Sequence, residues 1–515
     1  MDRLDLYTSI VPSERQIQVQ RDGFNVFIHY GLNTFTGKEW GDGKVPASMF
    51  NPTRQNTDQW VETIKNTGAK SIIFTAKHHD GFCMWQTKTT DYSVKNSPYK
   101  NGKGDVVREV ANSCKKYGMK FGVYLSPWDR NHKDYATPKY NDVYVEQLTE
   151  LLTQYGDISY VWLDGACGSY MDGKEKQVYD FERYFALIRK LQPNALISNC
   201  GPDIRWVGNE GGFARESEWN VVPAFSFDLQ TIERNSQQAD DGEFAKRGSD
   251  IVASDLGSRD FLSGFENFIW YPAEVDVSIR PGWFYHKSQD LMVRSVSNLL
   301  NIYYNAVGGN SLLLLNIPPD RQGLINKADV KRLNEFSKRI KSAFKNKVKI
   351  KQLRANAFEK GCNISNILNE NIIEETKDKK NYYTPIDEQE KYIIIMDFKK
   401  RTNIDKVKLV EDTRFSQRIE KFSIFAFIDG VQTLVYNGTT VGFSRIALFK
   451  KPILADGIVI TIDECRHKPY IEQISVFETD GKKLHEPMLK KAKIKVQQLN
   501  YQKFVDRENK KNKAL

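Results

Sequence analysis

The chain has 515 residues, which exceeds the size of one ordinary domain and predicts two or more. It contains no run of about 18 apolar residues, so the sequence predicts no membrane span. The net charge is +10, and part of it lies in the Lys- and Arg-rich stretch 490–513. Because no nucleic-acid-binding motif accompanies that stretch, we expect a solvated basic tail and no nucleic-acid partner.

Six cysteines are scattered along the chain without a CxxC pair, which argues against a structural zinc site or a disulfide scaffold. The first residues, MDRLDLY, do not have the pattern of a signal peptide. We expect a periplasmic or secreted protein whose signal peptide is absent from this sequence. A cytoplasmic protein is the alternative.

Short apolar runs alternate with helical patterns through residues 1–345. Strands are expected at 24–30, 71–77, 120–126, 158–164 and 195–200. The helices expected between them, at 57–67, 105–117, 143–155 and 180–191, are each followed by Gly or Pro, which is a typical stop signal. Repeated strand–helix alternation predicts parallel βαβ units. We therefore predict an α/β domain, an irregular (β/α)8-like TIM barrel.

The pattern becomes irregular after residue 200. The stretch 201–260 is polar and glycine-rich, without a clear helix. A strand at 268–277, a helix at 288–306, a strand at 311–317 and a helix at 328–345 are expected to complete the barrel.

From residue 346 to 480, short alternating strands separated by turns predict a β-sandwich. These strands are expected at 391–398, 406–411, 421–427, 434–436, 446–449, 457–462 and 470–477. Residues 481–515 form the predicted basic C-terminal tail.

Polar side chains gather where the first barrel strands end. Asp164 closes a buried apolar run and is followed by Gly165, and catalytic groups of (β/α) barrels sit at such strand ends. A helix N-cap or a solvated turn is the alternative for this aspartate. The corresponding ends of the other strands carry His29, the pair His78–His79, and Tyr124.

These residues fit a pocket for an uncharged, hydroxyl-rich ligand. Imidazole and phenol groups bind hydroxyls, and Trp40, Trp162 or Trp283 supplies an apolar face for a sugar ring. A metal site is the weaker interpretation because no HExxH spacing is present. No dinucleotide fingerprint and no GxSxG motif occur, so no cofactor is expected.

Glycoside hydrolysis requires a second carboxyl group besides Asp164. Glu210 lies in the segment WVGNEGG, where the glycines suit a loop that places one side chain in a tight space. Glu216 and Glu218 are the alternatives.

Several segments together resemble glycoside hydrolase family 29, the α-L-fucosidases. They are FIHYG at 27–31, AKHHDGF at 76–82, VWLDG at 161–165, IRPGWFY at 279–285 and LLLNIPP at 313–319. The resemblance implies a retaining exo-α-L-fucosidase that acts on fucosylated oligosaccharides or glycoconjugates. It also implies that Asp164 is the nucleophile and that the fucose site is lined by His29, Glu39, Trp40, His78, His79, Tyr124, Trp162 and Trp283.

The segment Gly208-Asn-Glu210 resembles the subfamily that prefers α-1,3/1,4-linked fucose of Lewis-type glycans, which implies that Glu210 is the acid/base. The C-terminal region resembles a galactose-binding-like (discoidin) sandwich, which is often attached to such enzymes as a carbohydrate-binding module. A sandwich that only supports the barrel is the alternative to one that binds sugar. A non-catalytic fucose lectin and a glycosidase of other sugar or linkage specificity remain alternative functions. The oligomeric state is left open.

Overall fold

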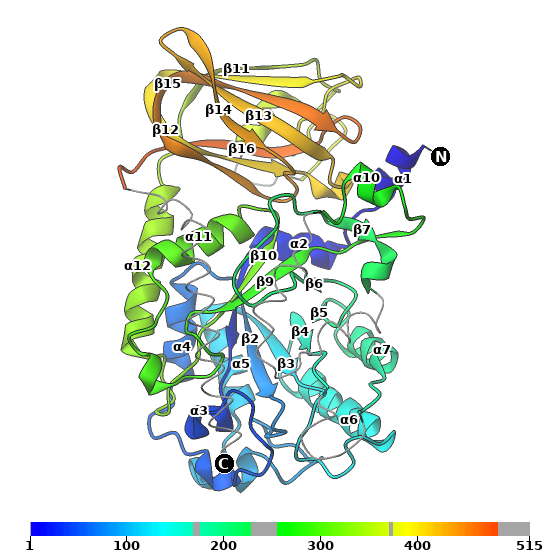
Figure 1. Cartoon of the computed structure of the whole chain (residues 1–515), viewed down its shortest axis with the longest axis vertical. Coiled ribbons are helices and arrows are strands. Elements are labelled where there is room, and N and C mark those ends of the chain that lie inside the picture. The colour runs from blue at the N-terminus through cyan, green and yellow to red at the C-terminus, as the bar shows by residue number, and fades with distance from the viewer. Residues whose placement is uncertain (1, 168–175, 228–254, 370–373, 483–515) are drawn as a thin grey trace.

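A computed structural model gives the structure of the protein over residues 2–167, 176–227, 255–369 and 374–482 (Figure 1). The predicted basic tail lies almost entirely outside these described residues. The chain forms a parallel barrel followed by an antiparallel β domain, which occupies the opposite end of the molecule from α3 (Leu32–Thr36) in Figure 1. Within the described residues, no helix has the length and apolar character that crossing a membrane requires.

The barrel is one parallel sheet of eight strands in the order β5-β4-β3-β2-β1-β10-β9-β6. Its strands are β1 (Phe24–Ile28), β2 (Ser71–Lys77), β3 (Lys120–Leu125), β4 (Tyr160–Leu163), β5 (Leu196–Asn199), β6 (Arg205–Trp206), β9 (Ala273–Ser278) and β10 (Leu312–Asn316). An isolated parallel bridge between Ser198 and Ile204 nearly closes the sheet. All residues of β1 and β2 are buried, as expected for strands covered on both faces.

Helices cover the first half of the barrel as the sequence predicts. They are α4 (Thr57–Lys65), α5 (Val106–Tyr117), α6 (Lys139–Gln154) and α7 (Phe181–Leu191). Side-chain caps fix several of their starts: Asp105 accepts a hydrogen bond from Arg108 N, and Asp180 accepts one from Arg183 N. The second half has α11 (Val296–Ala306) and α12 (Lys327–Ala343). This arrangement confirms the irregular (β/α)8-like barrel.

Two element predictions in the second half are wrong in detail. The expected strand 268–277 is two strands, because β8 (Phe268–Trp270) pairs with β7 (Val221–Pro223) whereas β9 belongs to the barrel. Pro272, which cannot donate to a sheet, lies at the break. The expected helix 288–306 is broken: a short 3-10 helix covers Lys287–Gln289, a loop follows, and α11 begins at Val296, where the Ser295 side chain accepts a bond from Asn298 N.

The C-terminal β domain is built around two long bent strands. β12 (Tyr392–Glu411) and β15 (Arg445–Cys465) pair along their length, with register shifts between Asp397 and Thr402 and near Ile404. Each therefore replaces two of the short strands expected from the sequence, because the strand continues through these register shifts and does not turn back there. β11 (Ile350–Ala355), β13 (Ile419–Ile428), β14 (Val431–Gly438) and β16 (Ile471–Glu478) complete this domain. Its separate apolar core contains residues such as Ile394 and Ile460.

Candidate active site

Side chains from three consecutive barrel strands meet at Asp164. This residue directly follows β4, and its Oδ2 accepts a 2.8 Å hydrogen bond from the Tyr124 hydroxyl of β3. The other oxygen, Oδ1, accepts a 2.8 Å bond from Ala166 N. His79, which follows β2, places Nε2 3.8 Å from Oδ2. The strand ends thus bring together Asp164, Tyr124 and His79, as the sequence predicts.

Aromatic and imidazole rings form a continuous cluster beside this carboxylate. The ring centres of His78 and His79 are 4.1 Å apart, and those of His29 and His78 are 5.7 Å apart. Trp283 reaches this cluster from the loop after β9, with its ring centre 5.0 Å from that of His29. Trp40 packs edge-on against His79 at 5.9 Å. The sequence-predicted site residues therefore share one region at the C-terminal end of the barrel.

The three histidines are neutral at ordinary pH. Burial lowers the pKa of His29 to about 3, despite an opposing hydrogen bond with Asn316. Burial lowers the pKa of His79 to about 4, and the Asp164 charge only partly offsets this effect. The pKa of His78 also falls well below its usual range, first by burial and then by repulsion from the other two rings. Each ring therefore carries a single N–H proton, and its other ring nitrogen is an acceptor.

Trp162 lies on β4, two residues before Asp164 and therefore deeper in the barrel. Its Nε1 donates a 2.9 Å bond to Glu274 of β9, a carboxyl group that the Tyr160 and Ser198 hydroxyls also contact. The ring of Trp162 stacks on Tyr124 with centres 5.4 Å apart. This stacking holds the phenol that contacts Asp164. Burial and the Asp164 charge raise the pKa of Tyr124, so its hydroxyl remains a donor.

Of the three glutamates considered for the second carboxyl, Glu210 lies in the ring cluster. Its Oε2 accepts a 3.1 Å bond from Trp283 Nε1. Desolvation raises the pKa of Glu210 to about 7; the Trp283 bond opposes this rise, and the charges of Asp164 and Glu39 add to it. A carboxyl group with this pKa is about half protonated at neutral pH, which suits a group that donates a proton.

The two alternative glutamates lie in other surroundings. Glu218 is fully buried between Arg205 and Arg215, and their charges hold its pKa below the usual range. It therefore serves as the anion of a structural ion cluster. Glu216 is exposed, and its carbonyl accepts bonds from Thr439 and Arg445 of the C-terminal domain.

The carboxylate of Glu39 is hydrogen-bonded to the loop that carries Trp283. Its Oε2 accepts a 2.8 Å bond from Trp283 N, and its Oε1 lies 2.7 Å from His286 Nε2. A Cβ atom on Gly282 would lie only 2.1 Å from Oε1, so this close approach requires glycine. Glu39 thereby ties the loop after β1 to the loop after β9. His286 is a site residue that the sequence analysis missed, although it directly follows the IRPGWFY segment.

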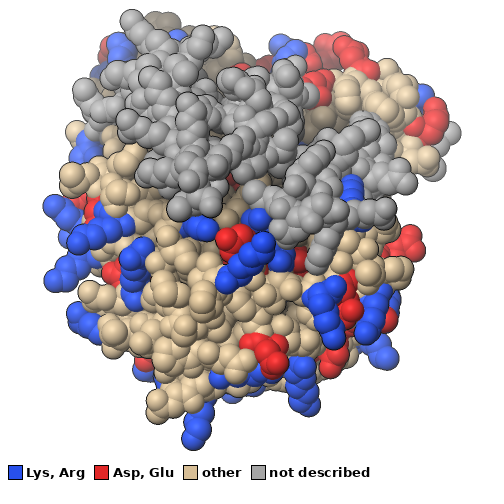
Figure 2. Space-filling model, turned by 60° about the horizontal axis from the view of Figure 1, so that its bottom comes forward, with Lys and Arg blue, Asp and Glu red and all other residues tan. Residues whose placement is uncertain are grey.

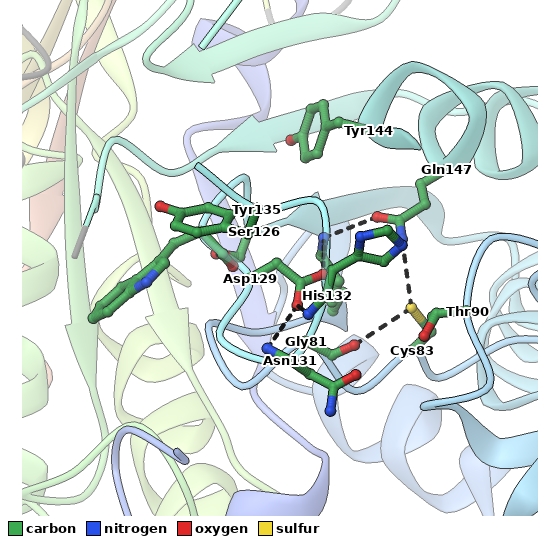
Figure 3. Close-up of polar contacts among 12 residues, drawn as sticks. Gly81, Cys83, Thr90, Ser126, Asp129, Asn131, His132, Tyr135, Tyr144 and Gln147 are labelled. Carbon is green, nitrogen blue, oxygen red and sulfur yellow. Dashed lines mark hydrogen bonds and ion pairs between the residues drawn. The ribbon is translucent and has the colours of Figure 1, made fainter. Parts of the chain in front are cut away.

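A buried polar network supports the turn that carries His78 and His79. Lys77 Nζ contacts Asp129 Oδ2 at 3.2 Å and donates to Gln147 Oε1 at 2.8 Å. Asp129 also accepts backbone bonds from Asn131 and His132, as Figure 3 shows. Since Lys77 and Asp129 are almost completely buried, their pairing fixes the ends of β2 and β3 relative to each other.

Among the described residues, no group of three or more His, Cys, Asp or Glu side chains is arranged to hold a metal ion.

Figure 2 turns the lower end of the molecule, near α3, toward the viewer. On the visible part of this face, Lys and Arg side chains are dispersed, with Asp and Glu among them. The charged side chains there do not gather into a single basic patch.

Known proteins match both the sequence and this architecture. A family profile described as alpha-L-fucosidase matches residues 14–343. Alpha-L-fucosidase 1 of Arabidopsis thaliana is 40% identical over 471 residues, covering 91% of this chain and 87% of its own length. A solved Bacteroides ovatus structure superposes with a TM-score of 0.80 at 41% identity, covering 94% of this chain and 77% of its own.

A Ruminococcus gnavus GH29 fucosidase solved in complex with fucose is similar as well, with a TM-score of 0.77 and 28% identity. The alignment covers 93% of this chain and 96% of that one. The profile match and the extended identity to the plant enzyme agree with the barrel and its strand-end residues. The chain therefore belongs to the α-L-fucosidases of glycoside hydrolase family 29.

Proposed function

We propose that this α-L-fucosidase acts with retention of configuration, with Asp164 as nucleophile and Glu210 as acid/base. The supporting observation is the contrast between the two carboxyl groups. Asp164 accepts bonds from Tyr124 and Ala166 N, which hold its carboxyl group in place at the end of β4. Glu210 is desolvated, with its pKa raised to about 7, and can carry the proton that a leaving oxygen needs.

In the first step, an Asp164 oxygen forms a bond to C1 of fucose while the glycosidic C–O bond breaks. Glu210 transfers its proton to the departing oxygen. In the second step, the Glu210 carboxylate removes a proton from water, whose oxygen attacks C1 and releases the Asp164 carboxylate. A retaining pair requires carboxyl groups roughly 5–5.5 Å apart, and this separation remains a prediction for the complex with substrate.

The ring cluster supplies the proposed sugar pocket. His29, His78, His79 and Tyr124 offer polar contacts to ring hydroxyls, while Trp40, Trp162 and Trp283 supply apolar faces. Glu39 contributes by fixing the Trp283 loop through its contacts with Trp283 N and His286. The fucose complex of the Ruminococcus gnavus relative supports fucose as the sugar.

Proton NMR of the first product formed from an aryl fucoside tests the mechanism. We expect α-L-fucose to appear before mutarotation, whereas initial β-L-fucose would exclude retention. Glu210→Gln tests the acid role, because acid assistance matters less for a good leaving group. We expect this variant to lose more activity on a natural trisaccharide than on the aryl fucoside. Equal losses on both would exclude Glu210 as the acid.

We further propose that the substrates carry α-1,3- or α-1,4-linked fucose on branched, Lewis-type acceptors. This proposal rests on the likeness of the Gly208-Asn-Glu210 segment to that subfamily. Product analysis with Lewis-type trisaccharides, 2′-fucosyllactose and an aryl fucoside tests it. Faster release from 2′-fucosyllactose than from the trisaccharides would contradict the assignment.

A further inference from the structure

The ring orientation and tautomer of His29 are fixed by Asn316 at the end of β10. Asn316 Oδ1 lies 2.9 Å from His29 Nδ1 and also accepts a 3.1 Å bond from His29 N. Asn316 Nδ2 donates a 2.8 Å bond to the carbonyl oxygen of Trp283. Because that carbonyl can only accept, the amide cannot be reversed. His29 therefore donates from Nδ1–H, and its neutral ring leaves Nε2 as a bare acceptor.

Ser126 has the same effect on His79. Its Oγ lies 2.7 Å from His79 Nδ1 and donates a 2.9 Å bond to the carbonyl of Trp128. A hydroxyl has one proton, and the Trp128 carbonyl takes it, so Ser126 must accept from His79 Nδ1–H. Figure 3 shows Ser126 near Asp129 in the loop after β3. The bare Nε2 of His79 then faces Asp164 Oδ2 at 3.8 Å.

His78, between these two rings, has the opposite arrangement. Asn33 Nδ2 donates to the Glu39 carbonyl at 3.1 Å and lies 3.4 Å from His78 Nδ1. Since the amide nitrogen is the donor, His78 Nδ1 accepts, and the proton of this neutral ring is on Nε2. The cluster thus contains two rings of one tautomer and one ring of the other.

We propose that Asn316 and Ser126 are positioning residues that lock His29 and His79 as Nδ1–H tautomers, so that the pocket presents two bare Nε2 acceptors and selects a sugar with hydroxyl donors at two positions. This proposal rests on the proposed function only in assuming that these rings face the sugar. A fluorine atom resembles a hydroxyl in size but has no proton to donate, so it cannot replace either hydroxyl. An unsatisfied buried acceptor disfavours such a ligand strongly.

Nitrogen-15 NMR of the full-length protein with labelled histidines tests the tautomers directly, because protonated and bare ring nitrogens differ in chemical shift. We expect Nδ1–H patterns for His29 and His79 and an Nε2–H pattern for His78. His29→Gln and His79→Gln variants assign the signals. An Nε2–H pattern for either His29 or His79 at neutral pH would overturn the proposal, whatever the enzyme's activity.

Two substitutions separate positioning from simple packing. Ser126→Ala should convert the His79 signal to a mixture of tautomers and raise KM about tenfold, whereas Ser126→Thr should restore the Nδ1–H pattern. Ser97→Ala removes another buried hydroxyl, one bonded to the Val94 carbonyl, and should change neither signal. An unchanged His79 signal in the folded Ser126→Ala variant would contradict the role of Ser126.

Asn316→Asp keeps an oxygen beside His29 but adds a negative charge. We expect the His29 ring to become protonated on both nitrogens at neutral pH, which changes the NMR signature independently of turnover. Retention of the wild-type Nδ1–H signal in this variant would contradict the role of Asn316.

Competition by L-fucose and its monodeoxyfluoro analogues against aryl fucoside hydrolysis tests the selection of donors. At the two ring positions whose hydroxyls donate to His29 and His79, we expect the fluoro analogue to bind about tenfold more weakly than L-fucose. At these positions the fluoro analogue should bind no better than the analogue that lacks the hydroxyl. Equal binding of all fluoro analogues would refute the donor requirement. Failure of the Asp164 and Glu210 assignments would instead appear in product stereochemistry and leaving-group dependence, which these binding measurements do not use.

Discussion

The contact between Trp283 and Glu210 leads to a prediction about the pH dependence of the enzyme. The indole Nε1–H donates to Glu210 Oε2 at 3.1 Å, and this bond stabilises the carboxylate form. The substitution Trp283→Phe keeps an aromatic ring but removes the donor. The pKa of Glu210 should therefore rise above its value of about 7.

The size of this shift follows from the hydrogen bond that is lost. A bond to a charged group is worth about 1.5–3 kcal/mol, and one pKa unit corresponds to about 1.36 kcal/mol. The variant should thus move the pKa of Glu210 upward by about one to two units. Because the acid must be protonated to act, kcat/KM falls as pH rises through this pKa. The wild-type alkaline limb should lie near pH 7, and the limb of the variant should lie at higher pH.

The assay is the pH profile of kcat/KM on a natural trisaccharide, where acid assistance is needed. Trp283→Phe also alters the sugar pocket, so its overall activity should fall, but only the pH of the limb tests the argument. Glu39→Gln is the matched control, since it removes a negative charge that raises the pKa of Glu210. Its limb should move to lower pH. A limb that stays fixed in both variants, or that moves down in Trp283→Phe, would refute the reasoning.

Three further predictions follow from the site. Asp164→Ala should lower aryl fucoside turnover by several orders of magnitude, and azide should restore part of it with fucosyl azide as product; near-normal activity without azide would exclude Asp164 as nucleophile. Gly282→Ala should displace the Glu39 carboxylate and lower kcat/KM by about a hundredfold in a folded enzyme, and unchanged kinetics would contradict the close contact. Glu218→Gln should destabilise the protein by about 3–5 kcal/mol in urea unfolding, because its two arginine partners stay buried. It should leave the alkaline limb of the kcat/KM profile in place, and a shifted limb would make Glu218 a candidate for the acid again.

The barrel strands could be predicted because the physics that forms them is local. Parallel strands covered on both faces appear as continuous apolar runs, and the polar residue that ends each run marks the catalytic end of the barrel. Asp164 and His79 follow such runs and Tyr124 lies one residue before the end of another, which is why the sequence predicts that they meet. The continuity of β12 and β15 could not be predicted, because the residues at their register shifts resemble turns in the sequence although the strands continue through them.

The residues that position the site could not be found in the same way. Asn316 acts on His29, and Glu39 acts on Trp283 and His286, across sequence separations of more than two hundred residues. Neither contact has a periodic signal in the sequence. Asn316 lies inside the LLLNIPP segment, so the motif was visible but its action on a histidine tautomer was not. The different surroundings of Glu210 and Glu218 likewise depend on arginines that only the fold brings near Glu218.

The neutrality of the three histidines has an electrostatic consequence for catalysis. If the rings were protonated, they would place positive charge beside a sugar that itself becomes positive near C1 in an oxocarbenium-like transition state. Burial keeps them neutral, and the charges that act on Glu210 are those of Asp164 and Glu39, both negative. The field of these two carboxylates raises the proton affinity of Glu210, the proposed acid, and favours positive charge near C1 in the proposed bond-breaking step. In the proposed mechanism the same carboxylates assist both proton donation and bond cleavage, and the imidazoles proposed to bind hydroxyls oppose neither effect.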